Sequence, residues 1–200
     1  MLNTGVSGQQ MAPDGLEPVR ILLNTWLIPP GTRQLEDRFN DFLHLREVSG
    51  EHGPLLREFR DDLRAGMGAR GWPDERINTW IDRCGIRVTV EGGQVAFRHT
   101  GTPVGEMMTA VLHAIQLGHW RRLKACPGCH WVFYDHSKSG SKRWCQVAKT
   151  DGPTGRACGT LDKSRRHRAR QMLTVPAVPV RPPDVRPDFT ALEPDTTWPQ

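Results

Sequence analysis

Apolar residues follow a helical period over most of the first two thirds of the chain. They recur three and four positions apart, with polar residues opposite, in four segments: 32–48, 53–66, 73–84 and 103–124. This spacing predicts four amphipathic helices. Apolar and polar residues alternate on both sides of Gly92-Gly93, which predicts a β-hairpin over 86–97. The apolar run 19–28 is too short for its period to decide between a strand and a helix.

Two of these segments carry predictions about individual side chains. The apolar face of segment 32–48 comprises Leu35, Phe39, Phe42, Leu43 and Arg46. In segment 73–84, Cys84 shares an apolar face with Trp80 and Ile81, so we expect a buried core thiol there. The stretch GMGARG (66–71) has the spacing of a dinucleotide-binding loop. Such a loop requires a preceding strand, which is missing, so we interpret the stretch as a linker between two helices.

Positive charge and cysteine are concentrated in the last third of the chain. Residues 119–172 contain 13 Lys and Arg against 3 Asp and Glu, whereas the remainder contains 14 against 19. An acidic body with a basic end predicts a polyanionic partner for that end, most commonly nucleic acid. Four of the five cysteines lie in the same basic region. The coincidence indicates one small module that carries both features.

The spacing of these four cysteines indicates a structural zinc site. Cys126 and Cys129 form a Cys-x-x-Cys pair that directs two thiolates at one centre, and Cys145 and Cys158 complete a tetrahedron. The 12-residue gap before Cys158 is long for a second knuckle, but its Gly and Pro residues are typical of a loop. Four thiolates leave no open coordination position. We therefore predict a structural Zn²⁺ that supplies much of the folding free energy of this module.

Other interpretations of the cysteines fit less well. CPGCH is literally the pattern of covalent haem attachment, but that reaction requires export, and the first residues lack the pattern expected of a secretory signal. A thioredoxin-like redox pair requires a surrounding βαβ pattern, which the sequence does not show. His130, His136 and His167 are alternative ligands, although four cysteines suffice without them.

At these residues the sequence resembles a known family. The stretch CPGCHWVFYDHSKSGSKRWC, followed by Cys-Gly and a basic segment, is similar to the CGNR zinc-finger proteins. The matching positions are Cys126, Cys129, Phe133, Tyr134, Asp135, Ser137, Arg143, Trp144, Cys145, Cys158, Gly159 and Lys163. The resemblance implies a DNA-binding, stress-responsive transcription regulator. It extends to residues 19–124, where LLNTWL resembles the early Asn-Thr segment of the helical ABATE domain, which is predicted to bind a ligand.

The sequence departs from that family in two places. Thr160-Leu161 stands where the family has Asn-Arg, and the gap before Cys158 is longer than in the family. If the Asn-Arg pair contacts DNA or orders the knuckle, that role is lost or altered in this chain. The zinc assignment is unaffected, because all four cysteines are present.

The segment after Cys158 predicts a helix with an almost entirely basic surface. It has few apolar residues to pack into a core, so contact with phosphate groups is its simplest use. We expect the nucleic-acid contacts at Lys142, Arg143, Lys163, Arg165, Arg166, Arg168 and Arg170. A solvated helix that contributes only solubility is the alternative.

Together these patterns predict a mainly α (α+β) protein: a helical N-terminal domain with one β-hairpin, then a small zinc-ribbon-like module with a basic helix. The expected organisation is a flexible arm (1–18), an ABATE-like domain (19–124), a CGNR-type zinc finger with its basic helix (125–173) and a disordered tail (174–200). The tail has seven prolines in 27 residues, which prevents a continuous helix or central strand.

The leading functional hypothesis is a cytoplasmic, zinc-containing transcription regulator that binds nucleic acid, with DNA favoured over RNA. Its N-terminal domain would sense a small-molecule effector or form a homodimer. An RNA-binding or ribosome-associated accessory protein is the second hypothesis. We do not expect an enzyme, since the N-terminal domain shows no Ser/His/Asp, paired-carboxylate or phosphate-loop signature. No membrane partner is expected either, because no apolar run approaches about 18 residues.

Overall fold

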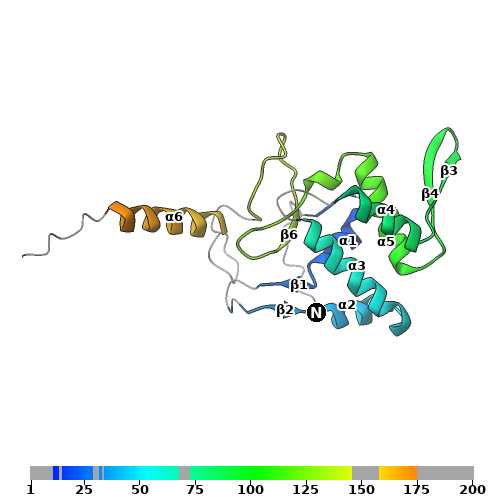
Figure 1. The fold of residues 1–200 in the computed structure, drawn as a ribbon, viewed down its shortest axis with the longest axis horizontal. Helices are drawn as coiled ribbons and strands as arrows, with labels where there is room; N and C mark the ends of the chain where they lie inside the picture. Colours follow the sequence, from blue (N-terminus) through cyan, green and yellow to red (C-terminus); the bar gives the residue numbers. More distant parts are fainter. Residues whose placement is uncertain are drawn as a thin grey trace, which may run out of the picture.

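The computed structural model describes residues 11–13, 15–28, 32, 34–67, 73–145 and 158–174. Most of GMGARG, most of the predicted arm and the proline-rich tail after residue 174 lie outside the described residues. Within them the chain forms helices and three small antiparallel sheets of two strands each (Figure 1). The predicted fold class, mainly α with α+β character, is confirmed.

Four helices pack around one apolar core. α1 (Leu16–Leu23), α3 (Gly53–Gly66) and α5 (Pro103–Gln116) contact one another, and α4 (Asp74–Arg83) packs on α3. Side chains with no exposed surface fill the space between them, among them Val19, Leu22, Phe59, Leu63, Trp80, Met108 and Val111. We call the described residues from 11 to 122 the helical body.

The predictions for α3 and α4 are confirmed, and the prediction for α5 is confirmed over most of its length. α5 begins where the Thr102 hydroxyl accepts a hydrogen bond from the Gly105 backbone N–H at 3.1 Å. It ends at Gln116 rather than near 124, because Gly118 turns the chain with a φ of 71°. A 3-10 helix, η3 (Trp120–Arg122), follows. As predicted, Cys84 is a buried thiol at the end of α4.

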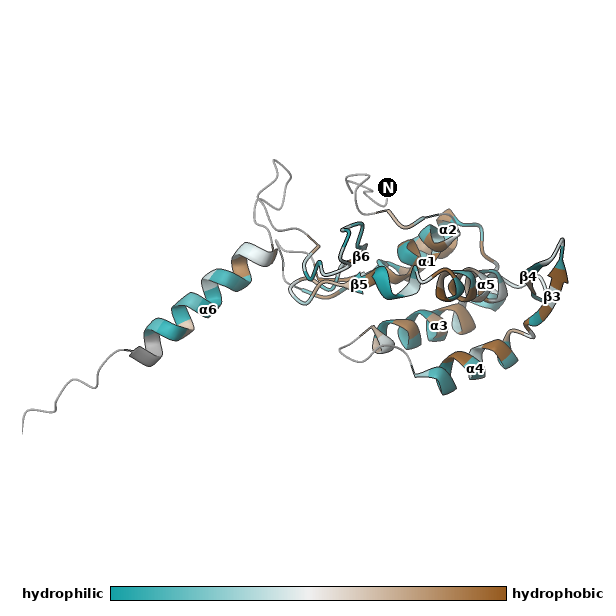
Figure 2. Ribbon diagram, turned by 90° about the horizontal axis from the view of Figure 1, so that it is seen from above, coloured by the Kyte–Doolittle hydropathy of each residue, from teal (hydrophilic) through white to brown (hydrophobic). Residues whose placement is uncertain are grey.

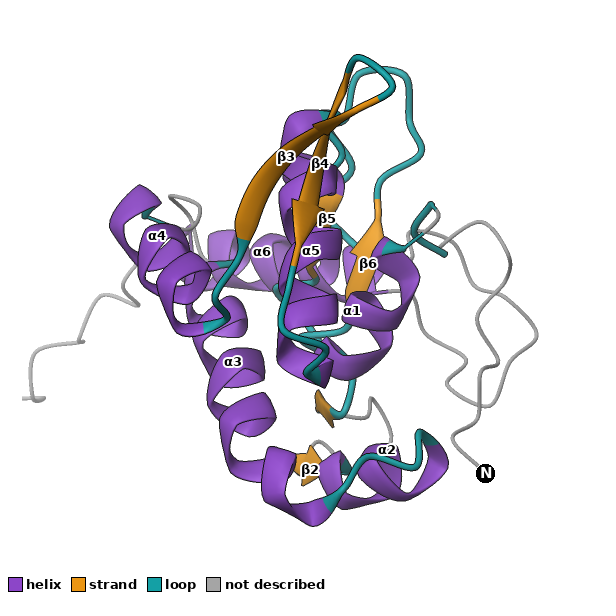
Figure 3. Ribbon diagram, turned by 90° about the vertical axis from the view of Figure 1, so that its right-hand side faces the viewer, coloured by secondary structure: helices purple, strands orange, loops and turns teal. Residues whose placement is uncertain are grey.

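The predicted hairpin is also present, as β3 (Arg87–Glu91) and β4 (Gln94–Arg98). Gly92 and Gly93 have φ values of 57° and 80°, which a tight hairpin turn requires. The apolar face of the hairpin is exposed at Val88, Val90 and Val95 and half-buried at Phe97, which packs on His113 with ring centroids 5.0 Å apart. The hairpin extends from the end of the body opposite the last helix (Figures 1 and 2), and its two strands lie in front of α5 in the view of Figure 3.

The first forty residues differ from the sequence predictions. α1 begins at Leu16, inside the range expected to be a flexible arm, and Leu16 is buried. Residues 19–28, whose period did not decide between a helix and a strand, contain parts of both. The end of α1 is followed there by strand β1 (Trp26–Leu27). Strand β2 (Glu36–Asp37) pairs with β1.

The helix predicted over 32–48 is consequently much shorter. α2 covers only Phe39–Leu45, and a 3-10 helix, η2 (Gly50–His52), precedes α3. Pairing with β1 holds residues 36–37 extended, and the Asp37 carboxylate accepts a hydrogen bond from the Phe39 N–H at 3.0 Å at the start of α2. Leu35 is therefore 55% exposed instead of lying on a buried helical face.

The third sheet joins the helical body to the cysteine-rich end. It pairs β5 (Leu123–Ala125) with β6 (Val132–Tyr134), with Leu123 opposite Tyr134. Leu123, Val132 and Tyr134 are buried in the core of the body. The domain boundary predicted between 124 and 125 thus falls within β5.

The last described element is α6 (Cys158–Thr174). It projects from the rest of the molecule, and most of its residues are coloured as hydrophilic (Figure 2). Among the described residues, no helix is both long and apolar enough to span a lipid bilayer.

Candidate metal centre

The four predicted cysteine ligands come together at one point. The sulfur atoms of Cys126, Cys129, Cys145 and Cys158 all lie within 4.8 Å of one another, and all four residues are buried. The Sγ atoms of Cys129 and Cys145 are 3.6 Å apart, and those of Cys145 and Cys158 are 3.8 Å apart. A tetrahedral zinc with Zn–S bonds of about 2.3 Å separates its sulfurs by about 3.8 Å. The cluster therefore has the dimensions of a zinc tetrathiolate.

A tight knuckle directs the first two sulfurs inward. The His130 N–H donates to the Cys126 carbonyl at 2.8 Å, and the Cys126 N–H donates to the Trp131 carbonyl at 2.9 Å. His130 takes a φ of 59°, a left-handed conformation that residues other than glycine seldom adopt. His130 therefore contributes its backbone conformation to the turn. The fourth member of the cluster is Cys158 and not His130.

Gly128 lets α6 approach this knuckle. A Cβ atom at position 128 would lie 3.3 Å from the Cβ of Cys158 and 3.3 Å from the Trp144 ring. Cys158 is the first residue of α6, so the positive end of the helix dipole points at the sulfur cluster and favours thiolate over thiol. Because position 128 has no side chain, Cys158, which is both a metal ligand and the first residue of α6, can lie next to the knuckle.

The donor set and its surroundings favour a structural metal. The five cysteines of the chain form no disulfide. Crowding of the sulfurs lowers the pKa of the Cys126 thiol, because hydrogen bonds from Cys129, Cys145 and Cys158 favour its thiolate. A bound Zn²⁺ would replace the thiol protons and be held by all four residues, with no position left for a substrate.

A buried carboxylate orders the loop that leads back to Cys145. Asp135 has no exposed surface, and it accepts hydrogen bonds from the Ser137 N–H at 2.9 Å and the Lys142 N–H at 2.8 Å. It also pairs with the Lys124 ammonium at 2.7 Å. Burial alone would raise the pKa of Asp135, but the hydrogen bonds from Lys124 and Ser137 outweigh it and lower that pKa. Asp135 is thus an ionised structural anchor.

The aromatic residues of this region divide between two cores. Phe133 is fully buried against the cysteines, with Trp131 and Trp144 half-buried beside it. Tyr134 instead belongs to the core of the helical body. Two neighbouring residues of β6, Phe133 and Tyr134, therefore belong to different cores.

Asn24 fixes the metal centre to the helical body through paired hydrogen bonds. Its side-chain amide donates to the Val132 carbonyl at 2.8 Å, and its side-chain oxygen accepts from the Val132 N–H at 2.7 Å. The Ile28 N–H adds a bond to the Cys129 carbonyl at 3.2 Å. Periodicity cannot reveal this role. The only sequence signal was the position of Asn24 in the segment LLNTWL.

The predicted nucleic-acid contacts fall into two groups. Lys142 and Arg143 lie in the loop before Cys145, with their charges 5.4 Å from the Phe133 ring and 5.7 Å from the Trp144 ring. The other five lie exposed along α6: Lys163, Arg165, Arg166, Arg168 and Arg170. Arg166 pairs with Asp162 at 2.7 Å. Thr160 and Leu161, which replace the Asn-Arg pair of the family, lie in the first turn of α6.

Comparison with known families agrees with this geometry. Residues 122–171 match the family model described as CGNR zinc finger. The matched range begins just before β5 and ends within α6, so it contains all four sulfur ligands. This part of the chain is therefore similar to CGNR zinc fingers, and its four cysteines form a Zn²⁺-binding module, which we call the zinc finger. No curated protein matches the chain.

Proposed function

We propose that this protein is a cytoplasmic DNA-binding transcription regulator in which the zinc centre positions α6 on the nucleic acid. One observation carries the proposal: a zinc ligand, Cys158, is also the first residue of a projecting helix with five exposed basic side chains. The same helix contains one acidic residue, Asp162. The proposal assigns a binding function to the chain and no catalytic one.

The arrangement of charge on α6 supports contact with a groove. At about 100° per residue, Lys163, Arg166 and Arg170 share one side of the helix, and Arg165 and Arg168 lie on the opposite side. A helix of 17 residues is about 25 Å long, and the major groove of DNA admits one helix between two phosphate backbones. Two opposed basic stripes suit a helix flanked by phosphates on both sides.

The helical body has a supporting role in this proposal. The likeness of residues 19–124 to an ABATE domain would make the body the part that senses an effector or forms a homodimer. Asn24 lies in the resembling segment and contacts β6 directly. A conformational change in the body would therefore be transmitted to the zinc centre through the hydrogen bonds between Asn24 and Val132.

Salt-dependent DNA binding tests the proposal. We expect the zinc-loaded protein to bind duplex DNA with an affinity that falls steeply with salt, because Lys and Arg displace counterions from phosphate. The double variant Arg165→Gln/Arg168→Gln should bind at least tenfold more weakly and show a shallower salt dependence, measured by fluorescence anisotropy. The matched control Arg87→Gln/Arg98→Gln removes the same charge from the distant hairpin and should bind normally. Equal losses in both variants would contradict the proposal.

The same assay separates the second candidate function. Structured RNA and duplex DNA of equal length compete for the labelled complex at matched ionic strength. We expect DNA to compete at least as well as RNA. A strong preference for RNA would instead favour the RNA-binding or ribosome-associated accessory protein.

A further inference from the structure

A large cavity lies between the helical body and the zinc centre. Its volume is about 1250 Å³, more than a small organic molecule requires. The body contributes residues of α3, α4 and the end of α5, and the zinc finger contributes Cys126, Pro127 and the segment 141–143. Among the described residues, the cavity is therefore bounded by both parts of the molecule.

Arg64 is the feature of this cavity that requires an explanation. It is half-buried and lines the cavity, and within the described residues its guanidinium donates to two backbone carbonyls, those of Leu23 and His130. The bond to His130 is 2.9 Å long. No carboxylate in the described part of the chain forms an ion pair with Arg64.

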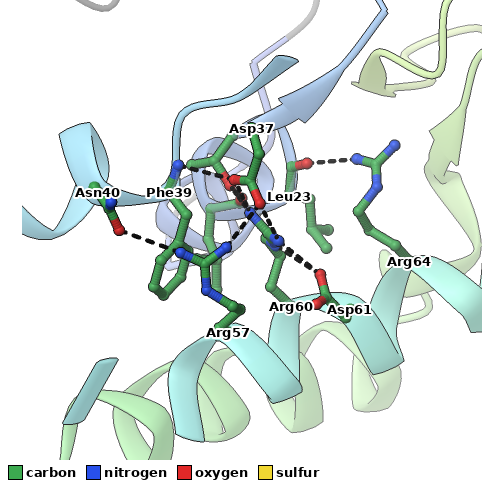
Figure 4. Close-up of polar contacts among 10 residues, drawn as sticks. Leu23, Asp37, Phe39, Asn40, Arg57, Arg60, Asp61 and Arg64 are labelled. Carbon is green, nitrogen blue, oxygen red and sulfur yellow. Dashed lines mark hydrogen bonds and ion pairs between the residues drawn. The ribbon is translucent and has the colours of Figure 1, made fainter. Parts of the chain in front are cut away.

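Arg60, one turn earlier on the same helix, shows the contrast. Its guanidinium is fully enclosed and pairs with Asp37 at 2.6 Å and with Asp61 at 2.8 Å. Figure 4 shows Arg60 between these two carboxylates, while Arg64 points away from them toward the Leu23 carbonyl. Burial and repulsion from Arg60 lower the pKa of Arg64 to about 10, which marks a cation without a full counter-charge.

The other residues that line the cavity indicate the kind of ligand that it would bind. The Trp26 ring lies 4.4 Å from the Arg64 guanidinium, and Trp120, Ile77 and Leu123 add apolar surface. Basic residues outnumber acidic ones along the lining by five to two: Arg64, Arg121, Lys124, Lys142 and Arg143 against Asp61 and Asp74. Lys124 and Asp61 are already engaged with Asp135 and Arg60. The cavity thus combines an apolar wall with an excess of positive charge.

We propose that this cavity binds an organic anion, whose carboxylate or similar acidic group pairs with Arg64 and whose planar apolar body packs on Trp26. Guanidinium groups recognise such acidic groups through paired hydrogen bonds and stack well on aromatic rings. Arg121, which is exposed at the rim, supplies a second positive charge. The proposal concerns ligand binding alone and holds whether or not α6 binds nucleic acid.

Two fluorescent probes of similar shape test this proposal on the full-length, zinc-loaded protein. One is the aromatic sulfonate 8-anilinonaphthalene-1-sulfonate, and the other is its neutral relative N-phenyl-1-naphthylamine. We expect saturable binding of the sulfonate. Arg64→Met should weaken sulfonate binding at least tenfold and binding of the neutral probe less than threefold. Equal affinity of the wild type and Arg64→Met for the sulfonate would overturn the proposal.

Two further variants guard against misfolding and against a competing site. Arg121→Gln changes an exposed residue, and it should weaken sulfonate binding about threefold. Val90→Ser removes the most exposed apolar side chain of the hairpin, which is 73% exposed. It should leave sulfonate binding unchanged. If Val90→Ser abolishes the signal while Arg121→Gln does not alter it, the probe binds the hairpin and the proposed site is wrong.

Discussion

The two hydrophobic clusters of this protein are stabilised in different ways. Among the described residues, the cluster of the helical body contains 21 buried side chains, nearly all apolar. The cluster of the zinc finger contains five, and four of these are the zinc-binding cysteines, with Phe133 the exception. Each large apolar side chain buried in the body contributes about 1.5–3 kcal/mol. The zinc finger has almost none, so its structure depends on the metal.

The two hydrophobic clusters are nevertheless connected through one sheet. Strands β5 and β6 carry apolar side chains into the core of the body and lead directly to the cysteines. Asn24 then binds the backbone of β6 from the body side. A metal-dependent region and an apolar core therefore share one sheet, and the following predictions test how far each depends on the other.

The largest effect is expected from loss of a zinc ligand. Cys126→Ser should lower bound zinc from one ion per chain to nearly none, since zinc binding supplies about 10–16 kcal/mol in small zinc modules. The signals of residues 123–145 and 158–171 should lose dispersion in a ¹H–¹⁵N correlation spectrum, while those of α3 and α5 persist. Cys84→Ser, which alters a thiol of the body, should keep its zinc. Full zinc content in Cys126→Ser would contradict the assignment.

An intermediate effect is expected at the connection between the clusters. Asn24→Ala removes both hydrogen bonds to Val132 and leaves a buried backbone N–H without that partner. We expect the free energy of unfolding to fall by about 2–4 kcal/mol, measured by urea denaturation of the zinc-loaded protein. Asn40→Ala, at an exposed position, should change it by less than about 0.5 kcal/mol.

The same variant reports whether the clusters are coupled. Competition with a chelator should show weaker zinc binding in Asn24→Ala, because part of the metal-binding free energy would then be spent on ordering β6. Unchanged zinc affinity together with reduced stability would mean that the zinc finger folds independently of the body.

The smallest effect is expected inside the body, at Asp37. Hydrogen bonds from Arg60 lower the pKa of Asp37, although burial opposes them. Because the folded pKa lies below the unfolded value of about 3.9, the ionised carboxylate stabilises the fold above that value, and this contribution is lost as pH falls through the folded pKa. Asp37→Asn should lower Tm at pH 7 by about 2–4 °C, roughly 1 kcal/mol.

Comparison at two pH values isolates this carboxylate. The difference in Tm between the wild type and Asp37→Asn should shrink from pH 7 to pH 3, measured by circular dichroism. Acid also releases zinc, but it does so in both proteins. A difference that stays constant with pH would show that the Asp37 charge does not stabilise the body.

Local patterns predicted those parts of the molecule that local forces determine. The ends of α3 and α4 follow from periodicity and turn residues, and the zinc ligands follow from thiolate spacing. Leu35 was misplaced because pairing between β1 and β2, a contact with another part of the chain, holds its neighbours extended. The role of Asn24 was not predicted for the same reason, since its partner Val132 lies 108 residues away. The cavity around Arg64 likewise exists only after α3 and the knuckle meet.

The shared sheet decides where this protein can be cut. A fragment that begins at residue 125 would lose most of β5 and leave β6 as a single unpaired strand exposed to aggregation. A better division is at Gly118, where the chain leaves α5 and enters no sheet. A C-terminal fragment that begins at Gly118 would still lack Asn24. The complementary N-terminal fragment, added separately, should therefore bind it and restore the hydrogen bonds between Asn24 and Val132.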